Sequence, residues 1–245
     1  MDTEELKKEQ LLINEKIERF AKEMGLSNNG TEPIYDGVAD IEKYLSCSKK
    51  IMWVLKEPYE GCDNNEKPIG GWSIVGDCFS GNGEDGKSPK YDAWANRSWQ
   101  PIIYSMYGYF NGLTWNTMSL IREDKSMANI LQQIAYINIS KMPNKTYSKT
   151  NQIWEFYYQW RPVLFEQIDI FYPDVVIFGS TFQYFKNDLG ISDNDLVTKS
   201  QVEGVLDPYK KDGRLWLDAY HPNQKRVKRE LYVDSIINAI KNDNE

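Results

Sequence analysis

The sequence predicts an α/β fold: a three-layer α/β/α sandwich around a central, mainly parallel, four-stranded sheet. Three observations indicate this fold. Four short apolar runs are typical of strands, segments with helical spacing separate them, and the 245-residue chain is 41% apolar, which suffices for one core. Strands that alternate with helices favour a parallel sheet covered on both faces. We therefore expect a single domain over residues 1–245.

The N-terminal region is predicted to be a helix outside the main sheet. Apolar residues recur there at helical spacing, at Leu6, Ile13, Ile17, Phe20 and Met24. One face of the helix is therefore apolar, and "GLSNNG" then supplies a stop signal. We expect residues 1–48 to form a helical extension of the core.

The four strands are expected at "KIMWVL" (50–55), "QIAYINIS" (133–140), "DVVIFGS" (174–180) and "RLWLDAY" (214–220). Helical patterns lie between them at 98–110, 151–168 and 181–188, and "KRELYVDSIINAIKN" closes the chain. From Tyr59 to Tyr91 the sequence is glycine-rich and polar, which predicts a long loop. Loops of that length in compact domains are often functional.

Composition limits where the protein acts and what it binds. A net charge of −7 and a pI near 5.0 give no overall attraction to a polyanion, so any contact with DNA must be local. Three cysteines, an odd number without CxxC spacing, favour a reducing compartment. The opening "MDTEELKKEQ" lacks a signal-peptide core, and no run approaches the roughly 20 apolar residues of a membrane span. We expect a cytoplasmic monomer without membrane contact.

The sequence contains one match to a dinucleotide-binding motif, but the match lacks the surrounding elements. "GNGEDG" (81–86) matches GxGxxG, but no strand precedes it and no apolar helix follows. Both elements are needed for dinucleotide binding. We therefore expect no cofactor and no metal.

Functional side chains are expected where the strands end, because ligands of parallel α/β sheets bind beyond the carboxyl ends of the strands. The four segments that leave the strands are "KEPYEG", "NISKMP", "FGSTFQ" and "YHPNQKR". They carry the carboxylate of Glu57, the amide of Asn138, a glycine that begins a helix, and His221, the only histidine. The sequence predicts that these groups share one polar crevice.

This set of motifs, in this order, resembles the uracil-DNA glycosylase superfamily. "VLKEPYEG" is similar to its acid-Pro-Tyr turn, "INISKMP" to its strand-end Asn segment, "YPDVVIFGS" to its P-x-V-hydrophobic-x-G strand, and "AYHPN" to its His-Pro-Ser motif. The resemblance covers residues 49–230. It implies a DNA base glycosylase that hydrolyses the N-glycosidic bond of uracil or a related damaged base.

The resemblance assigns a role to each matching residue. Base departure places positive charge on the sugar and negative charge on the base. Glu57 would stabilise the sugar cation or orient water, His221 would stabilise the leaving base, and Asn138 would read uracil through its amide. Tyr59 matches the tyrosine that crowds the position of thymine's methyl group. The extruded base would stack on an aromatic ring, either Trp72 or Phe79.

Contacts with DNA phosphates are expected from Ser180, Asn223, Lys225 and Arg226. Asn223 replaces the family serine after His-Pro and can still donate a hydrogen bond. Lys225 and Arg226 belong to a local basic segment, "NQKRVKR", which would give salt-sensitive binding. Such a run is equally typical of the solvated face of a helix.

Leu55 and Lys56 replace the Gly and Gln that precede the acid in the family, which predicts a bulkier pocket wall. Glu57 is one methylene longer than the aspartate of the best-known members. The cysteine pattern does not match the iron-sulfur branch.

Simpler interpretations and other function classes remain for the same residues. A Glu-Pro after a strand is often an ordinary turn, a His before Pro is often structural, and Asn138 could satisfy backbone groups. A scaffold can also persist after its chemistry has changed. One alternative is therefore an inactive or repurposed member that binds a nucleotide, nucleic acid or protein. Another is a hydrolase of free nucleosides or nucleotides.

Overall fold

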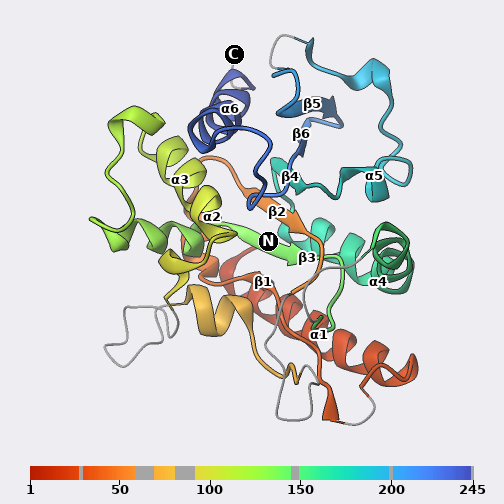
Figure 1. Cartoon of the computed structure of the whole chain (residues 1–245). Coiled ribbons are helices and arrows are strands. Elements are labelled where there is room, and N and C mark those ends of the chain that lie inside the picture. The colour runs from red at the N-terminus through yellow and green to blue at the C-terminus, as the bar shows by residue number, and fades with distance from the viewer. Residues whose placement is uncertain (28–29, 59–68, 81–91, 145–148, 199–200, 244–245) are drawn as a thin grey trace.

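The computed structural model describes residues 1–27, 30–58, 69–80, 92–144, 149–198 and 201–243 (Figure 1). The fold is mixed α/β, with a six-stranded sheet in the order β1-β3-β2-β4-β6-β5. The strands are β1 (Gly37–Val38), β2 (Ile51–Leu55), β3 (Ala135–Asn138), β4 (Val175–Gly179), β5 (Leu206–Lys211) and β6 (Arg214–Ala219). The inner four are parallel, and β1 and β5 are antiparallel edge strands.

The four predicted strands are confirmed as β2, β3, β4 and β6, but the predicted number of strands was wrong. Two edge strands complete the sheet. β1 has two residues, too few for any periodic pattern, and it lies in the region predicted to be purely helical. β5, "LDPYKK", carries a proline and two lysines, which is a composition tolerated at a sheet edge.

The helices largely follow the predicted pattern. They are α1 (Thr3–Glu23), α2 (Ile41–Ser46), α3 (Trp99–Phe110), α4 (Thr150–Phe171), α5 (Phe182–Phe185) and α6 (Arg229–Asn242). The expected helix at 181–188 forms only the single turn of α5. A π-helical segment covers Ile74–Phe79, and 3₁₀ segments cover Ala93–Ala95, Trp115–Thr117, Lys125–Gln133 and Asp193–Asp195.

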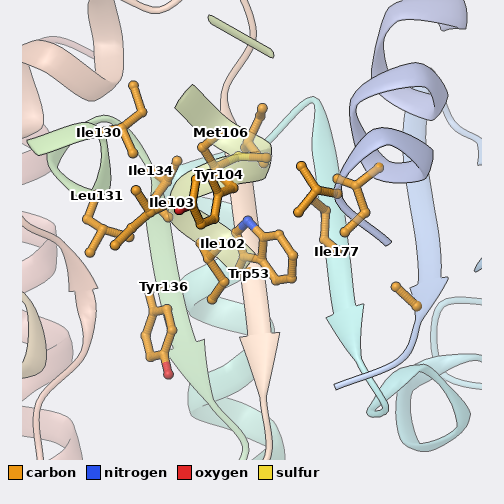
Figure 2. Packing of buried hydrophobic residues seen from close by; sticks show 14 of the residues in the cluster. Trp53, Ile102, Ile103, Tyr104, Met106, Ile130, Leu131, Ile134, Tyr136 and Ile177 are labelled. Atoms are coloured by element: carbon orange, nitrogen blue, oxygen red, sulfur yellow. The ribbon is translucent and has the colours of Figure 1, made fainter. Parts of the chain in front are cut away.

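Helices cover both faces of the sheet because the inner strands are apolar on both sides. In β2, Trp53 faces a core shared with α3 and α6, whereas Met52 and Val54 face a core shared with α1, α4 and α5. Figure 2 shows Trp53 packed against Ile102 of α3 and its neighbours. All five residues of β2 are buried, as expected for an inner parallel strand.

The N-terminal region is joined to the sheet by a buried ion pair as well as by β1. Lys141 Nζ lies 2.8 Å from both carboxylate oxygens of Asp36 and 2.7 Å from Gln167 Oε1. Asp36 also accepts from Gln167 Nε2 at 2.7 Å and from the backbone N–H of Asn138 at 2.7 Å. Burial lowers the pKa of Lys141, and Asp36 opposes that shift. We call Asp36, Lys141 and Gln167 the buried cluster.

The described residues include neither a membrane-spanning helix nor a cluster of metal ligands. None of the described helices has the length and apolar character needed to cross a membrane. Within the same residues, no group of three or more His, Cys, Asp or Glu side chains is placed to hold a metal ion.

Candidate active site

A pocket of about 750 Å³ lies at the carboxyl end of β2 and is completed by the segment before the π-helix, the start of α3, β3 and the loop after β6. Four predicted site residues line it together: Glu57, Trp72, His221 and Asn223. The strand-end argument therefore located the pocket from sequence. Leu55 and Lys56, which were expected to form part of the pocket wall, also line it.

Glu57 lies in a chain segment that the backbone holds in place. Beyond β2, the carbonyls of Leu55, Lys56 and Pro58 accept from the N–H groups of Ile139, Ser140 and Asn144 at 2.8, 2.9 and 3.0 Å. Backbone hydrogen bonds therefore flank Glu57 on both sides, although the regular pairing of β2 with β3 ends at Leu55 and Asn138. The Glu57 side chain is half-buried, and its Oε2 atom is buried at the pocket wall. A rigid backbone therefore presents this carboxylate.

His221 is anchored through its backbone and its ring. Its N–H donates to Ser180 Oγ at 2.8 Å, and its Nδ1 accepts from the N–H of Asn223 at 3.1 Å. Burial, followed by the nearby charge of Lys56, lowers the pKa of His221 from 6.5 to about 4. The ring is therefore neutral at neutral pH. Because Nδ1 accepts a hydrogen bond, Nε2 carries the proton and is a donor.

The backbone around Gly179 and Ser180 allows this loop to approach β4. A Cβ at Gly179 would lie 2.3 Å from Leu55 Cδ2 and 3.1 Å from Pro222 Cδ. Ser180 has a left-handed φ of 59°, and its N–H donates to the carbonyl of Ala219 at 2.8 Å. Ser180, predicted to contact DNA phosphate, is outside the pocket lining and acts as the acceptor for His221.

Three aromatic side chains, Trp72, Trp99 and Tyr136, line the pocket and form what we call the aromatic wall. The two residues predicted to stack on the base differ in their position relative to it. Trp72 lines the pocket, whereas Phe79 is fully buried behind it. Phe79 makes edge contacts with Trp99 and Tyr136, with ring centroids 4.9 and 5.4 Å apart. Those two rings line the pocket, and Trp99 Nε1 donates to the Tyr136 hydroxyl at 3.3 Å. In Figure 2 the Tyr136 hydroxyl points away from the aliphatic cluster.

Asn138, the predicted base reader, lies beneath this wall. It is 1% exposed and is not among the residues that line the pocket. It follows Tyr136 by two residues in β3, so the two side chains share a face of the sheet. Its Nδ2 atom is buried and has no hydrogen-bond partner among the described residues. Trp53 Nε1 and Trp160 Nε1 are buried donors in the same condition, in the apolar core.

Of the predicted basic segment, Asn223 lines the pocket, whereas its cationic residues do not. Lys225 and Arg226 are exposed, and the Arg226 guanidinium lies 5.3 Å from the centre of the Tyr220 ring. Tyr59 and the "GNGEDG" segment (81–86) fall outside the described residues.

The start of α3 and Tyr136 in β3 contribute to the pocket, which was not predicted from the sequence. Asn96, Arg97 and Trp99 line the pocket, and none of them was among the predicted site residues. Asn96 Oδ1 accepts from the N–H groups of Ser98 and Trp99 at 2.9 and 3.3 Å. An Asn ahead of an apolar helix is a start signal, so "NRSW" could have placed the beginning of α3 but not its position beside Glu57.

No known protein-family model matches this chain, and no curated protein matches it significantly. Any function proposed for the chain therefore depends on the geometry of the pocket.

Proposed function

We propose that this chain is a monofunctional DNA base glycosylase with the three-layer α/β/α architecture of the uracil-DNA glycosylase superfamily. It would hydrolyse the N-glycosidic bond of uracil or a related damaged base. The observation that carries the proposal is that Glu57 and a neutral, Nε2-protonated His221 line one pocket. One group is suited to stabilise a cation and the other to stabilise an anion, which is the charge pattern of this bond cleavage.

The proposed reaction needs only water. The bond between C1′ and the base nitrogen breaks, and its electron pair leaves with the base while positive charge grows on the sugar. Glu57 stabilises that charge and orients the water that adds to C1′. This water loses a proton as the new C–O bond forms, and the base anion gains one, so that the base is released in its neutral form. His221 donates a hydrogen bond from Nε2 to the carbonyl oxygen of the departing base. A donor that is already neutral is not deprotonated near pH 7, so it serves throughout the step.

Base selection would use the aromatic wall and Asn138. Trp72, Trp99 and Tyr136 offer ring faces or edges to an extruded base. The buried Nδ2 of Asn138 would find an acceptor in the carbonyl of a base that reaches this end of β3. Among the predicted stacking rings, exposure in the pocket favours Trp72 over Phe79.

The direct test incubates purified protein with end-labelled oligonucleotides that contain uracil or other deaminated bases, single- and double-stranded, followed by alkaline cleavage of abasic sites. Glu57→Gln and His221→Ala are each expected to reduce cleavage about 10²–10³-fold. Glu203→Gln removes an exposed carboxylate outside the pocket lining and should leave the rate unchanged. Absence of any abasic product at low salt and high protein concentration would refute the proposed activity.

One observation favours a second candidate, a non-catalytic nucleotide-binding module. Asn138 is buried and does not line the pocket, so the pocket as it stands lacks its predicted reader. A binding module would take up nucleotides with wild-type affinity in the Glu57→Gln variant and release no base. Release of base from free nucleotides with DNA inert would instead indicate a nucleotide hydrolase.

A further inference from the structure

Two cationic side chains line the candidate pocket, and neither forms an ion pair with any residue that the structure describes. They are Lys56, half-buried beside Glu57, and Arg97, which is exposed. His221 is neutral, so the described lining carries two cations and the single carboxylate of Glu57. The chain as a whole has a net charge of −7. The described lining therefore carries a net positive charge on an acidic protein, which favours anions there.

The two cations come from separate elements that are both fixed in position. Lys56 follows β2, and its carbonyl accepts from the N–H of Ser140 at 2.9 Å. Arg97 lies between Asn96 and Ser98 in the turn that Asn96 caps at the start of α3. The backbone at each of the two positions is therefore held by its own hydrogen bonds. The positive end of the 12-residue helix α3 adds to the same field.

We propose that Lys56 and Arg97 bind the phosphate of the substrate, so that the pocket takes a phosphorylated nucleoside rather than a free base or nucleoside. Arg offers a planar fork for phosphate oxygens, and Lys offers a compact charge. A pocket of about 750 Å³ has the size of a site for a whole small-molecule ligand. This inference deepens the proposed function and rests on it for the identity of the base. The phosphate can belong to a DNA strand or to a free nucleotide.

The site differs from the one that the sequence predicted. Lys225 and Arg226 are exposed and do not line the pocket, and the Arg226 guanidinium lies over the Tyr220 ring. They are placed to meet a longer strand outside the pocket, whereas Lys56 and Arg97 meet the nucleotide inside it. Substitution of Lys56 and Arg97 should therefore weaken the binding of a mononucleotide, whereas substitution of Lys225 and Arg226 should not.

The test measures binding without cleavage. Quenching of tryptophan fluorescence, to which Trp72 and Trp99 contribute, reports occupancy by 2′-fluorodeoxyuridine, its 5′-monophosphate, inorganic phosphate and a short single-stranded oligonucleotide with one 2′-fluorodeoxyuridine. Fluorine at C2′ disfavours the sugar cation and preserves the glycosidic bond. Wild-type protein should bind the monophosphate at least about tenfold more tightly than the nucleoside, because each lost hydrogen bond to a charged group costs about a factor of ten. The double variant Lys56→Gln/Arg97→Gln should lose that preference.

Matched variants separate a specific loss from a change in net charge. Lys8→Gln/Lys22→Gln removes two exposed cations of α1 and should retain the preference for phosphate. Lys56→Arg/Arg97→Lys should retain most of it, and circular dichroism should show that all variants are folded. Equal binding of nucleoside and monophosphate by wild type would overturn the proposal. The proposal would also be overturned if Lys225→Gln/Arg226→Gln lost the preference for phosphate while Lys56→Gln/Arg97→Gln kept it.

The readout also separates this inference from the proposed activity. Phosphate preference that depends on Lys56 and Arg97, without base release from any substrate, would keep the anion site and refute the glycosylase. Base release that is insensitive to the double substitution would keep the glycosylase and refute the anion site. Tighter binding of the oligonucleotide than of the monophosphate assigns the phosphate to a DNA strand, and equal binding assigns it to a free nucleotide.

Discussion

Two groups of charged side chains lie near the carboxyl ends of β2 and β3, and they differ in how their charge is balanced. In the buried cluster, the charge of Lys141 meets Asp36 and Gln167 at 2.7–2.8 Å, and both charged residues are at most 1% exposed. At the pocket, Lys56 and Arg97 have no ion-pair partner within the described chain. Lys56 directly follows β2, and Lys141 lies three residues after the end of β3.

The presence or absence of an ion-pair partner indicates which of these charges stabilise the fold and which are available to bind a ligand. A buried charge needs a partner and hydrogen bonds within the protein, because desolvation otherwise costs several kcal/mol. A charge at a pocket can be balanced by solvent until a ligand replaces it. Lys141 therefore belongs to the scaffold, and Lys56 belongs to the site.

The same substitution at both lysines should produce the largest contrast. Lys141→Met leaves Asp36 buried and uncompensated, which is expected to lower the free energy of unfolding by about 3–5 kcal/mol. Lys56→Met breaks no ion pair within the described chain and should change it by less than about 0.5 kcal/mol. Urea denaturation of both variants measures the contrast, and equal losses would show that Lys56 is also structural. The double variant Asp36→Asn/Lys141→Met should recover part of the loss.

The acid dependence of His221 should provide the next largest effect. Its pKa is about 4 in the folded chain and 6.5 in the unfolded chain, so the unfolded chain binds more protons between these values. The stability contributed by neutral His221 is therefore present above pH 6.5 and is lost as the pH falls toward 4. Between pH 6.5 and 4, the free energy of unfolding of His221→Asn should fall by about 2–3 kcal/mol less than that of wild type.

The pH dependence of wild type must be compared with that of His221→Asn, because Asp218 has the opposite effect on the pH dependence of stability. Burial and the charge of Asp207 raise the pKa of Asp218 to about 6, so its contribution falls as the pH rises. His221 is the only histidine, and its imidazole signals can be followed by NMR without ambiguity. Lys56→Met should raise the pKa of His221, since Lys56 lowers it in the wild type. An unchanged pKa would mean that Lys56 and His221 do not share a site.

Ser180 should give the smallest effect on stability. Ser180→Gly suits the left-handed φ of 59° and removes only the acceptor of the His221 N–H, so stability should change by less than about 1 kcal/mol. Ser180→Ala keeps the strained backbone and should be the less stable of the two. Both should weaken base release more than they weaken nucleotide binding, because His221 would act in the reaction step. Wild-type rates in both would remove Ser180 as a positioning residue.

The inner strands and the pocket could be predicted from sequence, but contacts between distant segments could not. Apolar runs located β2, β3, β4 and β6, and the strand-end rule brought Glu57 and His221 together. β1 and β5 have no apolar periodicity, since their pairing depends on the neighbouring strand. Asn138 also lies at a strand end and is nevertheless 1% exposed, on the face of β3 that carries the buried Tyr136. Sequence position alone does not reveal such burial.

The cluster around Asp36 also constrains how the chain folds during synthesis. Asp36 bonds to groups that lie 102, 105 and 131 positions further along the chain, and α1 packs against α4 (Figure 1). Contacts of such long sequence separation form slowly, because a large loop must close first. Helix α1 therefore leaves the ribosome long before its partner exists, with its apolar stripe exposed. Nascent chains that stop before α4 should depend on chaperones and should be sensitive to proteolysis within α1.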